Sequence, residues 1–208
     1  MMATETEATP LIRHLAAEEL RIAASILLNA YKDDPFFRAV FPAQEYEQRL
    51  RAAIREELQE LWQRQQGFIG LELDGALIAV ACLSDGHYPL GQARFWNWRL
   101  KMALGTGWHG ARQWMAREQE IMAQLADEHT DLLQFVAVSP GYQRRGFGEA
   151  LLRSVVTTQR EAGRHALATL NYWPELTTLF ERLGFRSVAA IHVGQVEGRL
   201  CRVEMSEL

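Results

Sequence analysis

A short loop of glycines and arginines, between an apolar run and a helical pattern, carries the clearest chemical signal in the chain. Residues 132–156 have the sequence LLQFVAVSPGYQRRGFGEALLRSVV. The first amides of a helix have no intrahelical acceptor and carry a partial positive charge, so they can bind an anion. Gly146 and Gly148 have no Cβ that would block such a ligand, and residues 143–145 add side-chain donors. The residues alone leave two interpretations equally open: a diphosphate site, or a strand-to-helix turn with solvated arginines.

Two well-known nucleotide motifs do not fit this loop. The dinucleotide fingerprint needs a third glycine where this chain has Leu151, and an acidic residue at the end of the next strand. A P-loop needs Gly-Lys-Ser or Gly-Lys-Thr after four residues, and that sequence is absent. Both motifs are therefore excluded as the explanation of the loop.

Two motifs together resemble the GCN5-related N-acetyltransferase (GNAT) family. VAVSPGYQRRGFGEALL, residues 136–152, is similar to the Gln/Arg-x-x-Gly-x-Gly/Ala signature of that family. LFERLGF, residues 179–185, resembles the helix that ends in Leu-Gly-Phe before a closing strand. The resemblance covers about residues 132–193, whereas the N-terminal half resembles the family only in the order of its elements.

The resemblance implies an acyl-CoA co-substrate, with acetyl-CoA expected first, and direct transfer of the acyl group to an amine in a ternary complex. The amine would belong to a small molecule or a protein. In this family the strands that correspond to residues 131–138 and 165–170 splay apart, so pantetheine bonds along the open edge as an added strand would. Arg144 and Arg145 then either reach the phosphates or point to solvent. The residues expected to contact coenzyme A are Val136, Ala137, Val138, Gln143, Arg144, Arg145, Gly146, Phe147, Gly148, Glu149 and Asn171.

The usual catalytic side chains of the family do not carry over to this sequence. Phe180 stands where many members have a tyrosine as general acid, and Ala168 where some have a glutamate as base. The backbone amide of Val138 would polarise the thioester carbonyl. Tyr172 is a candidate replacement acid, or else an aromatic ring packed at a strand end. Without the usual groups, a non-catalytic acyl-CoA-binding sensor of the same fold remains the alternative function.

Several other acidic residues and histidines are candidates for the general base. Glu72 is the first of them, although for each residue taken alone the sequence favours a solvated side chain at the end of a strand. Asp33 and Asp34 fall in a loop that borders the acceptor site in the family, although Asp34 before Pro35 is also a typical helix N-cap. The remaining candidates are Asp131, His87 and His129.

The order of the elements predicts an α/β (α+β) fold with a mixed sheet of six to seven strands and helices on both faces. A strand at residues 10–15 and two helical segments precede a hairpin, whose runs 68–73 and 76–84 meet at Asp74-Gly75. Strand, helix, strand, helix and two closing strands follow. We expect a single N-acetyltransferase domain over residues 1–208, with a disordered start in residues 1–9.

A helical insertion at residues 87–130 separates the third and fourth strands. It contains four of the six tryptophans, at positions 96, 98, 108 and 114, and its glycines predict at least two helices. With Arg94, Arg99 and Lys101 these rings could line an aromatic, partly cationic pocket. They could instead form a small core of the insertion itself, or an interface in a homodimer.

The composition narrows the class of protein. The formal charge of −4 over 208 residues argues against general affinity for nucleic acid or acidic membranes. Cys82 and Cys201 have no metal-type spacing and are expected to be reduced packing residues, and no metal is expected. Neither a signal peptide nor a long apolar span is evident, so we expect a soluble cytoplasmic protein.

Overall fold

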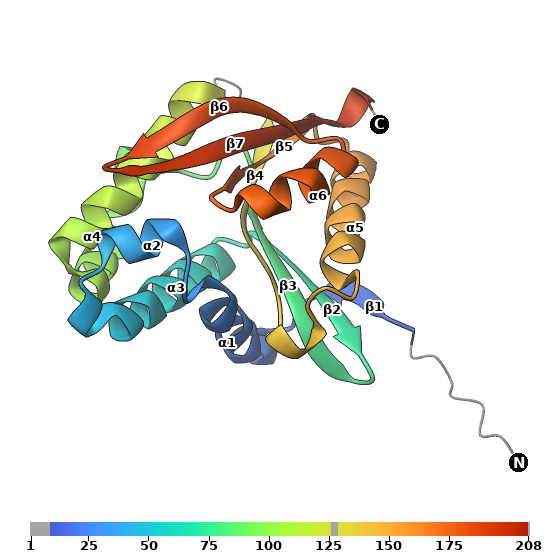
Figure 1. Cartoon of the computed structure of the whole chain (residues 1–208), viewed down its shortest axis with the longest axis horizontal. Coiled ribbons are helices and arrows are strands. Elements are labelled where there is room, and N and C mark those ends of the chain that lie inside the picture. Colours follow the sequence, from blue (N-terminus) through green and yellow to red (C-terminus); the bar gives the residue numbers. More distant parts are fainter. Residues whose placement is uncertain (1–8, 126–128, 208) are drawn as a thin grey trace, which may run out of the picture.

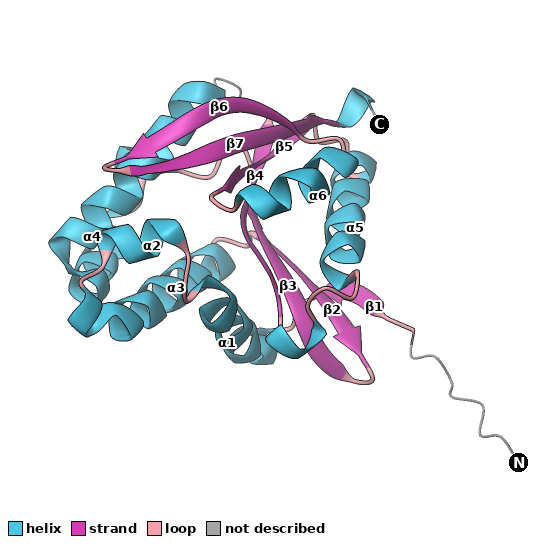
Figure 2. Cartoon of the chain, in the orientation of Figure 1, coloured by secondary structure: helices cyan, strands magenta, loops and turns pink. Residues whose placement is uncertain are grey.

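The computed structural model describes residues 9–125 and 129–207, and the predicted disordered start falls almost wholly outside these ranges. The elements follow the predicted order (Figures 1 and 2). The strands are β1 (Leu11–His14), β2 (Gly67–Leu73), β3 (Ala76–Ser84), β4 (Thr130–Val138), β5 (Ala166–Asn171), β6 (Arg186–Val193) and β7 (Val196–Glu204). The helices are α1 (Leu20–Tyr31), α2 (Pro35–Val40), α3 (Tyr46–Gln63), α4 (Trp96–Leu125), α5 (Phe147–Glu161) and α6 (Thr177–Arg182).

The predicted mixed sheet is confirmed, with seven strands in the order β1-β2-β3-β4-β5-β7-β6. Only β4 and β5 pair in parallel, and every other neighbouring pair is antiparallel. The predicted turn at Asp74-Gly75 joins β2 to β3, and both residues have positive φ, as a two-residue hairpin turn requires. Asp34 caps α2 and Pro35 takes its first position, as the sequence predicts.

The sheet opens between β4 and β5. Thr130–Leu133 pairs with residues 166–169, and the pairing stops there although both strands continue. Figure 1 shows the β2–β3 part and the β5–β7 part of the sheet diverging from this point. On its other side, β4 has an extra residue at Gln134, where the register with β3 shifts between Cys82 and Leu83. Such a bulge bends a strand and increases its twist, which helps to separate it from β5.

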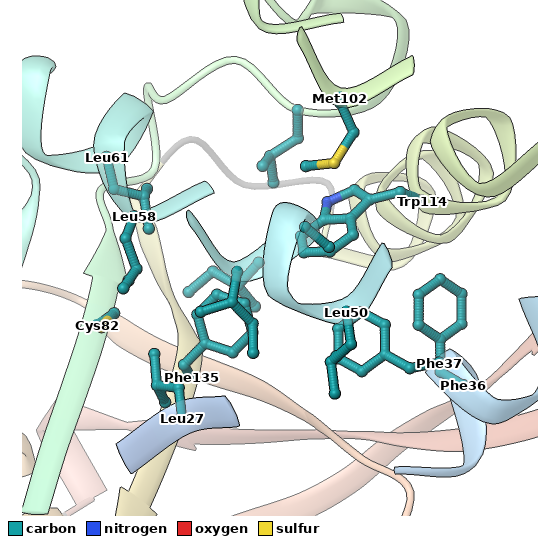
Figure 3. Packing of buried hydrophobic residues seen from close by; sticks show 14 of the residues in the cluster. Leu27, Phe36, Phe37, Leu50, Leu58, Leu61, Cys82, Met102, Trp114 and Phe135 are labelled. Atoms are coloured by element: carbon teal, nitrogen blue, oxygen red, sulfur yellow. The ribbon is translucent and has the colours of Figure 1, made fainter. Parts of the chain in front are cut away.

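Helices cover both faces of the sheet and bury a separate core on each. Helices α1–α4 gather on one side, and α5 and α6 lie on the other (Figure 2). The first core includes Leu27, Phe36, Leu50 and Trp114 (Figure 3). The second core packs α5 and α6 against β2–β5 and β7. Within the described ranges, no helix is long and apolar enough to cross a membrane.

The insertion is built on α4, which breaks at Gly107, where φ is 81° and ψ is 158°. Trp98 and Trp114 are buried in the core that α4 shares with α1–α3, whereas Trp96 and Trp108 are 72% and 67% exposed. The insertion therefore does not build a separate core of its own. Arg94 is buried as well, and it forms ion pairs instead of lining a pocket.

Candidate active site

A cavity of about 610 Å³ occupies the opening between β4 and β5. One end is lined by Arg144, Gly146 and Gly148, at the start of α5. The other end is lined by Tyr31 from the end of α1, Asp34 from the start of α2, Arg117 from α4 and Tyr172 from the end of β5. Because α5 and α1–α4 lie on opposite faces of the sheet, the cavity passes through the opening from one face to the other.

The loop before α5 has the backbone shape of an anion site. Arg144 has a φ of 60° and Gly146 a φ of 85°, so the chain turns twice through the left-handed region just before the helix begins at Phe147. A Cβ built on Gly146 would meet nothing within 4 Å, so the glycine leaves open space beside the loop. The amides of Phe147, Gly148 and Glu149 have no acceptor within the helix, since they belong to its first turn. Backbone amides arranged in this way form a concave anion site.

The edge of β4 that faces the opening presents backbone groups to the cavity. The Tyr31 hydroxyl accepts a hydrogen bond from Val136 N at 3.3 Å and lies 3.4 Å from Val136 O. Since successive residues of a strand point their amides in opposite directions, Val138 N faces the same edge. Gln143 Nε2 donates to Val138 O at 3.0 Å, which ties the loop to this edge. The Tyr31 and Gln143 side chains therefore occupy backbone hydrogen-bonding groups of β4 that an added strand could otherwise use.

Most residues that were expected to contact coenzyme A line this cavity. They include Val136 and Ala137 on β4, and Asn171 at the end of β5. Arg145 and Phe147 do not line it: the Arg145 guanidinium lies 5.6 Å and 5.4 Å from the ring centres of Tyr142 and Phe147. The cavity-lining members of the expected set are Val136, Ala137, Val138, Gln143, Arg144, Gly146, Gly148, Glu149 and Asn171.

Asp34 is a buried carboxyl at the helical end of the cavity. Its Oδ1 accepts from the Phe37 amide at 3.1 Å, which is the N-cap bond of α2. Burial raises the pKa of Asp34 to about 6, and the Phe37 amide and the charge of Arg117 offset part of this rise. The residue is therefore both a helix cap and a carboxylate that titrates close to neutral pH.

Tyr172 and Arg117 complete this end of the cavity. The Tyr172 ring stacks on Phe36 with centres 5.9 Å apart, and its buried hydroxyl lies beside Arg117 and donates to no acceptor among the described residues. Burial raises the pKa of Tyr172 to about 12, so the hydroxyl stays protonated near neutral pH. The Arg117 guanidinium lies over the rings of Phe36 and Trp114, at 4.5 and 4.6 Å from their centres.

The other candidate bases lie away from the cavity lining. Glu72 accepts two hydrogen bonds from Arg13, at 2.6 and 3.0 Å, near the β1 edge of the sheet. Asp131 accepts from Gly86 N and Gln159 Nε2 at the amino end of β4. His87 and His129 contact each other with ring centres 6.3 Å apart, at the same end. The cavity lies at the carboxyl end of β4, so these side chains do not face it.

The departures from the family pattern are visible in the structure. Phe180 lines the cavity and packs edge-on against Phe185, and it offers no proton. Ala168 is fully buried in the core on the α1–α4 face. Asn171 closes a local turn, because its side chain accepts from Trp173 N and donates to Trp173 O, both at 2.9 Å.

Sequence reasoning missed Arg117 and the hydroxyl of Tyr31 as parts of the site. A signal for Arg117 exists, since it lies three residues after Trp114 and four before Ile121, on the buried stripe of α4. A charged residue on such a stripe needs a partner or a ligand. Tyr31 fits the apolar stripe of α1 so well that its hydroxyl gives no separate signal.

Comparisons with known proteins agree with this geometry. A family model described as acetyltransferase (GNAT) domain matches residues 109–187. A comparison with curated protein sequences found no match. Among solved structures, a histone acetyltransferase HPA2 and related acetyltransferase from Corynebacterium glutamicum has a TM-score of 0.69 and 17% identity, over 93% of this chain and 95% of that chain.

Two further solved structures share the fold over similar lengths. The PaiA N-acetyltransferase from Thermoplasma acidophilum, in complex with coenzyme A, has a TM-score of 0.60 and 13% identity, over 94% and 99% of the two chains. The ribosomal-protein-S18-alanine N-acetyltransferase from Escherichia coli has a TM-score of 0.57 and 16% identity, over 95% and 94%. The chain therefore shares the fold of these acetyltransferases, and its residues 109–187, which include the loop motif, match the model of a GNAT acetyltransferase domain.

Proposed function

We propose that this protein transfers an acetyl group from acetyl-CoA to a primary amine, by direct attack of the amine on the thioester in a ternary complex. One observation carries the proposal: an unpaired edge of β4 and the free amides of the α5 start face a single cavity. The cavity reaches through the sheet, so a donor that enters from the α5 face meets an acceptor that enters from the α1–α4 face.

The residues of the loop and of β4 fit coenzyme A. The amides of residues 144–149 would bind the diphosphate, and Gly146 leaves room for its oxygens. The edge of β4 would bond the pantetheine amides as an added strand. For this to happen the Tyr31 hydroxyl must give up its contacts with Val136. Val138 N would then donate to the thioester carbonyl and stabilise the charge that develops there.

Asp34 and Tyr172 would handle the protons. Above about pH 6 Asp34 is ionised and accepts a proton from the attacking amine. The new C–N bond forms as the C–S bond breaks, and the sulfur leaves as a thiolate. The Tyr172 hydroxyl lies beside Arg117 but donates to no acceptor among the described residues, so it can donate a hydrogen bond to the departing sulfur. The thiolate then takes a proton from solvent. Glu72, which is bound to Arg13, has no part in this scheme.

Removal of the Tyr172 hydroxyl tests this role. We expect Tyr172→Phe to lower kcat about 10- to 100-fold with little change in the Kd of acetyl-CoA, because stacking on Phe36 is kept. Tyr46→Phe is the matched control, since Tyr46 is also buried with a pKa raised by burial to about 12, but it does not line the cavity. Thiol release measures kcat, and calorimetry measures acetyl-CoA binding. Equal rates for the two variants would contradict the role.

A non-catalytic acyl-CoA-binding module is the second candidate. Phe180 favours it, since this residue lines the cavity without a hydroxyl. Tight acetyl-CoA binding without thiol release, over a broad panel of amines, would support the module over the enzyme. A cytoplasmic location and a homodimer stay predictions from the sequence, as does the preference for acetyl over longer acyl groups.

A further inference from the structure

Arg117 is a buried cation that forms no direct ion pair among the described residues, although its charge acts on the nearby Asp34. It is 9% exposed and lines the cavity, and its Nε is buried without a hydrogen-bond partner. Among the described residues, no carboxylate lies within 4.0 Å of its guanidinium nitrogens. Burial of an unpaired charge is costly, so proteins keep such a group when it has a partner to bind.

The surroundings hold the guanidinium in place beside the Tyr172 hydroxyl, and no carboxylate of the described residues occupies its outer nitrogens. Phe36 and Trp114 lie against it, as both ring distances are below 5 Å. Asp34 shares this end of the cavity, but its Oδ1 accepts from the Phe37 amide. Tyr172 also borders this end and offers a hydroxyl. A cation held between two rings beside a cavity is typical of a site for a planar anion.

We propose that the acceptor is a small amino carboxylate, and that Arg117 binds its carboxylate while its amine faces Asp34. This inference rests on the proposed acetyl transfer and names its substrate class. A guanidinium and a carboxylate match in a bidentate pair, which also fixes the orientation of the bound molecule. The cavity of about 610 Å³ must also hold the pantetheine arm, so the room left for the acceptor is that of a small molecule.

The phosphates of coenzyme A do not explain Arg117. The anion loop lies at the start of α5, which packs on the opposite face of the sheet from α4. A carboxylate-free polyamine does not explain it either, because a second cation beside Arg117 would be repelled. An acceptor that carries a carboxylate as well as an amine would place a group of opposite charge against each of the two buried side chains, Asp34 and Arg117.

Matched amines that differ only in the carboxylate provide the test. Phenylalanine is compared with phenylalaninamide and 2-phenylethylamine, lysine with lysinamide and 1,5-diaminopentane, and 4-aminobutanoate with its amide. The readout is kcat/KM from thiol release at saturating acetyl-CoA. For at least one set, we expect the carboxylate to be preferred about 10- to 100-fold, as a charge-assisted bidentate pair would give. Equal or better use of the carboxylate-free amines in every set overturns the proposal.

Variants of Arg117 show whether this residue makes the distinction. In Arg117→Gln we expect the ratio of kcat/KM for the acid to that for its amide to fall towards one, and Arg117→Lys to keep part of it. Arg112→Gln is the matched control, because Arg112 is an exposed arginine on the same helix. If Arg117→Gln lowers kcat/KM for all amines alike, with the ratio unchanged, Arg117 has a purely structural role and the proposal fails. Thermal unfolding of each variant verifies that it is folded.

Two binding measurements separate failure of this proposal from failure of the proposed function. Calorimetry with acetyl-CoA alone tests the proposed function. If acetyl-CoA binds but no amine is turned over, N-acetylphenylalanine and its amide are titrated into the protein in the presence of coenzyme A. The N-acetylated acids and amides of the other two sets are titrated in the same way. Tighter binding of an acid than of its amide, lost in Arg117→Gln, supports the carboxylate site. No such difference in any set overturns it.

Discussion

Two arginines of the insertion are both buried, but only one of them is paired. Arg94 is 2% exposed, and its nitrogens donate to Glu57 at 2.5 Å, to Glu118 at 2.6 Å and to Tyr88 at 2.7 Å. Arg117 lies one helical turn from Trp114, whose indole donates to the same Glu118, yet no acidic group in residues 9–125 and 129–207 forms an ion pair with Arg117. The charge of Arg94 is therefore compensated by carboxylates of α3 and α4, whereas Arg117 on the cavity wall has no such direct ion pair among the described residues.

The difference between Arg94 and Arg117 distinguishes a buried charge that stabilises the fold from a buried charge that can bind a ligand. The Arg94 network joins α3 and α4 to the segment before α4, so its charges have a structural role. The charge of Arg117 serves no such contact, and it faces the same cavity as Asp34 and Tyr172. In this chain the buried charge of Arg117 points to the site more clearly than the catalytic positions expected from the family resemblance, since Phe180 and Ala168 lack the usual groups.

The largest effect is expected when the paired arginine is removed. Arg94→Met leaves Glu57 and Glu118 buried without their cation, and loss of one member of a buried ion pair costs about 3–5 kcal/mol. Denaturant unfolding should show this loss in the free energy of unfolding. A loss below about 1 kcal/mol would mean that the network does not hold the insertion in place.

The next largest effect is expected at Asp34, the buried carboxyl at the helical end of the cavity. Asp34→Asn keeps an oxygen that can accept from Phe37 N, and so keeps the helix cap, but it removes the base. We expect kcat/KM to fall about 100-fold or more. In the unmodified protein kcat/KM should rise with pH through about 6 and then level off, because the base acts when ionised. A wild-type profile without this rise would exclude Asp34 as the base.

The same carboxyl also predicts how stability depends on pH. Its pKa is higher in the folded than in the unfolded protein, so the folded state binds more protons between about pH 4 and pH 6. The contribution of Asp34 to stability therefore decreases as pH rises through this window. Asp34→Asn should flatten that decrease in denaturant unfolding experiments, whereas an unchanged slope would contradict the raised pKa.

A smaller effect is expected at the anion loop. Gly146→Ala places a Cβ in the open space beside the amides and should weaken acetyl-CoA binding about tenfold, measured by calorimetry. Gly163→Ala is the matched control, since Gly163 has a φ of 71° and also has nothing within 4 Å of a built Cβ. Both variants should lose about 1 kcal/mol of stability from the left-handed backbone. Equal weakening of acetyl-CoA binding in both would exclude a specific role for Gly146.

The smallest effect is expected when the unpaired arginine is removed. Arg117→Met loses no ion pair and can still pack on Phe36 and Trp114, so we expect the free energy of unfolding to change by about 1 kcal/mol or less. Denaturant unfolding alongside Arg94→Met makes the comparison direct. A loss as large as that for Arg94→Met would show that Arg117 supports the fold.

Local signals explain why most of the fold could be predicted. The Asp74-Gly75 turn, the Asp34 cap and the apolar stripe of α3 each depend on residues that are close in sequence. The anion loop could also be predicted, because strand, glycines and helix are contiguous. These features set the element order, and the element order leaves few topologies for a mixed sheet.

The helical end of the site could not be predicted in the same way. It depends on α1, α2, α4 and β5, which only the folded chain brings together. Tyr31 and Val136, for example, are 105 residues apart in sequence. The sequence shows only that candidates such as Asp131 and His129 are polar and near strand ends. They lie at the amino end of β4, whereas the opening lies at the carboxyl ends of the parallel pair.

A crystal structure with bound acetyl-CoA would test the central claim most directly. We predict that the diphosphate lies on the amides of residues 144–149 and the pantetheine along β4, with the Tyr31 hydroxyl displaced from Val136. The thioester carbonyl should lie within hydrogen-bond distance of Val138 N, with its open face towards Asp34, Arg117 and Tyr172. Coenzyme A bound elsewhere, with Tyr31 still on Val136 and the β4 edge unused, would contradict the account.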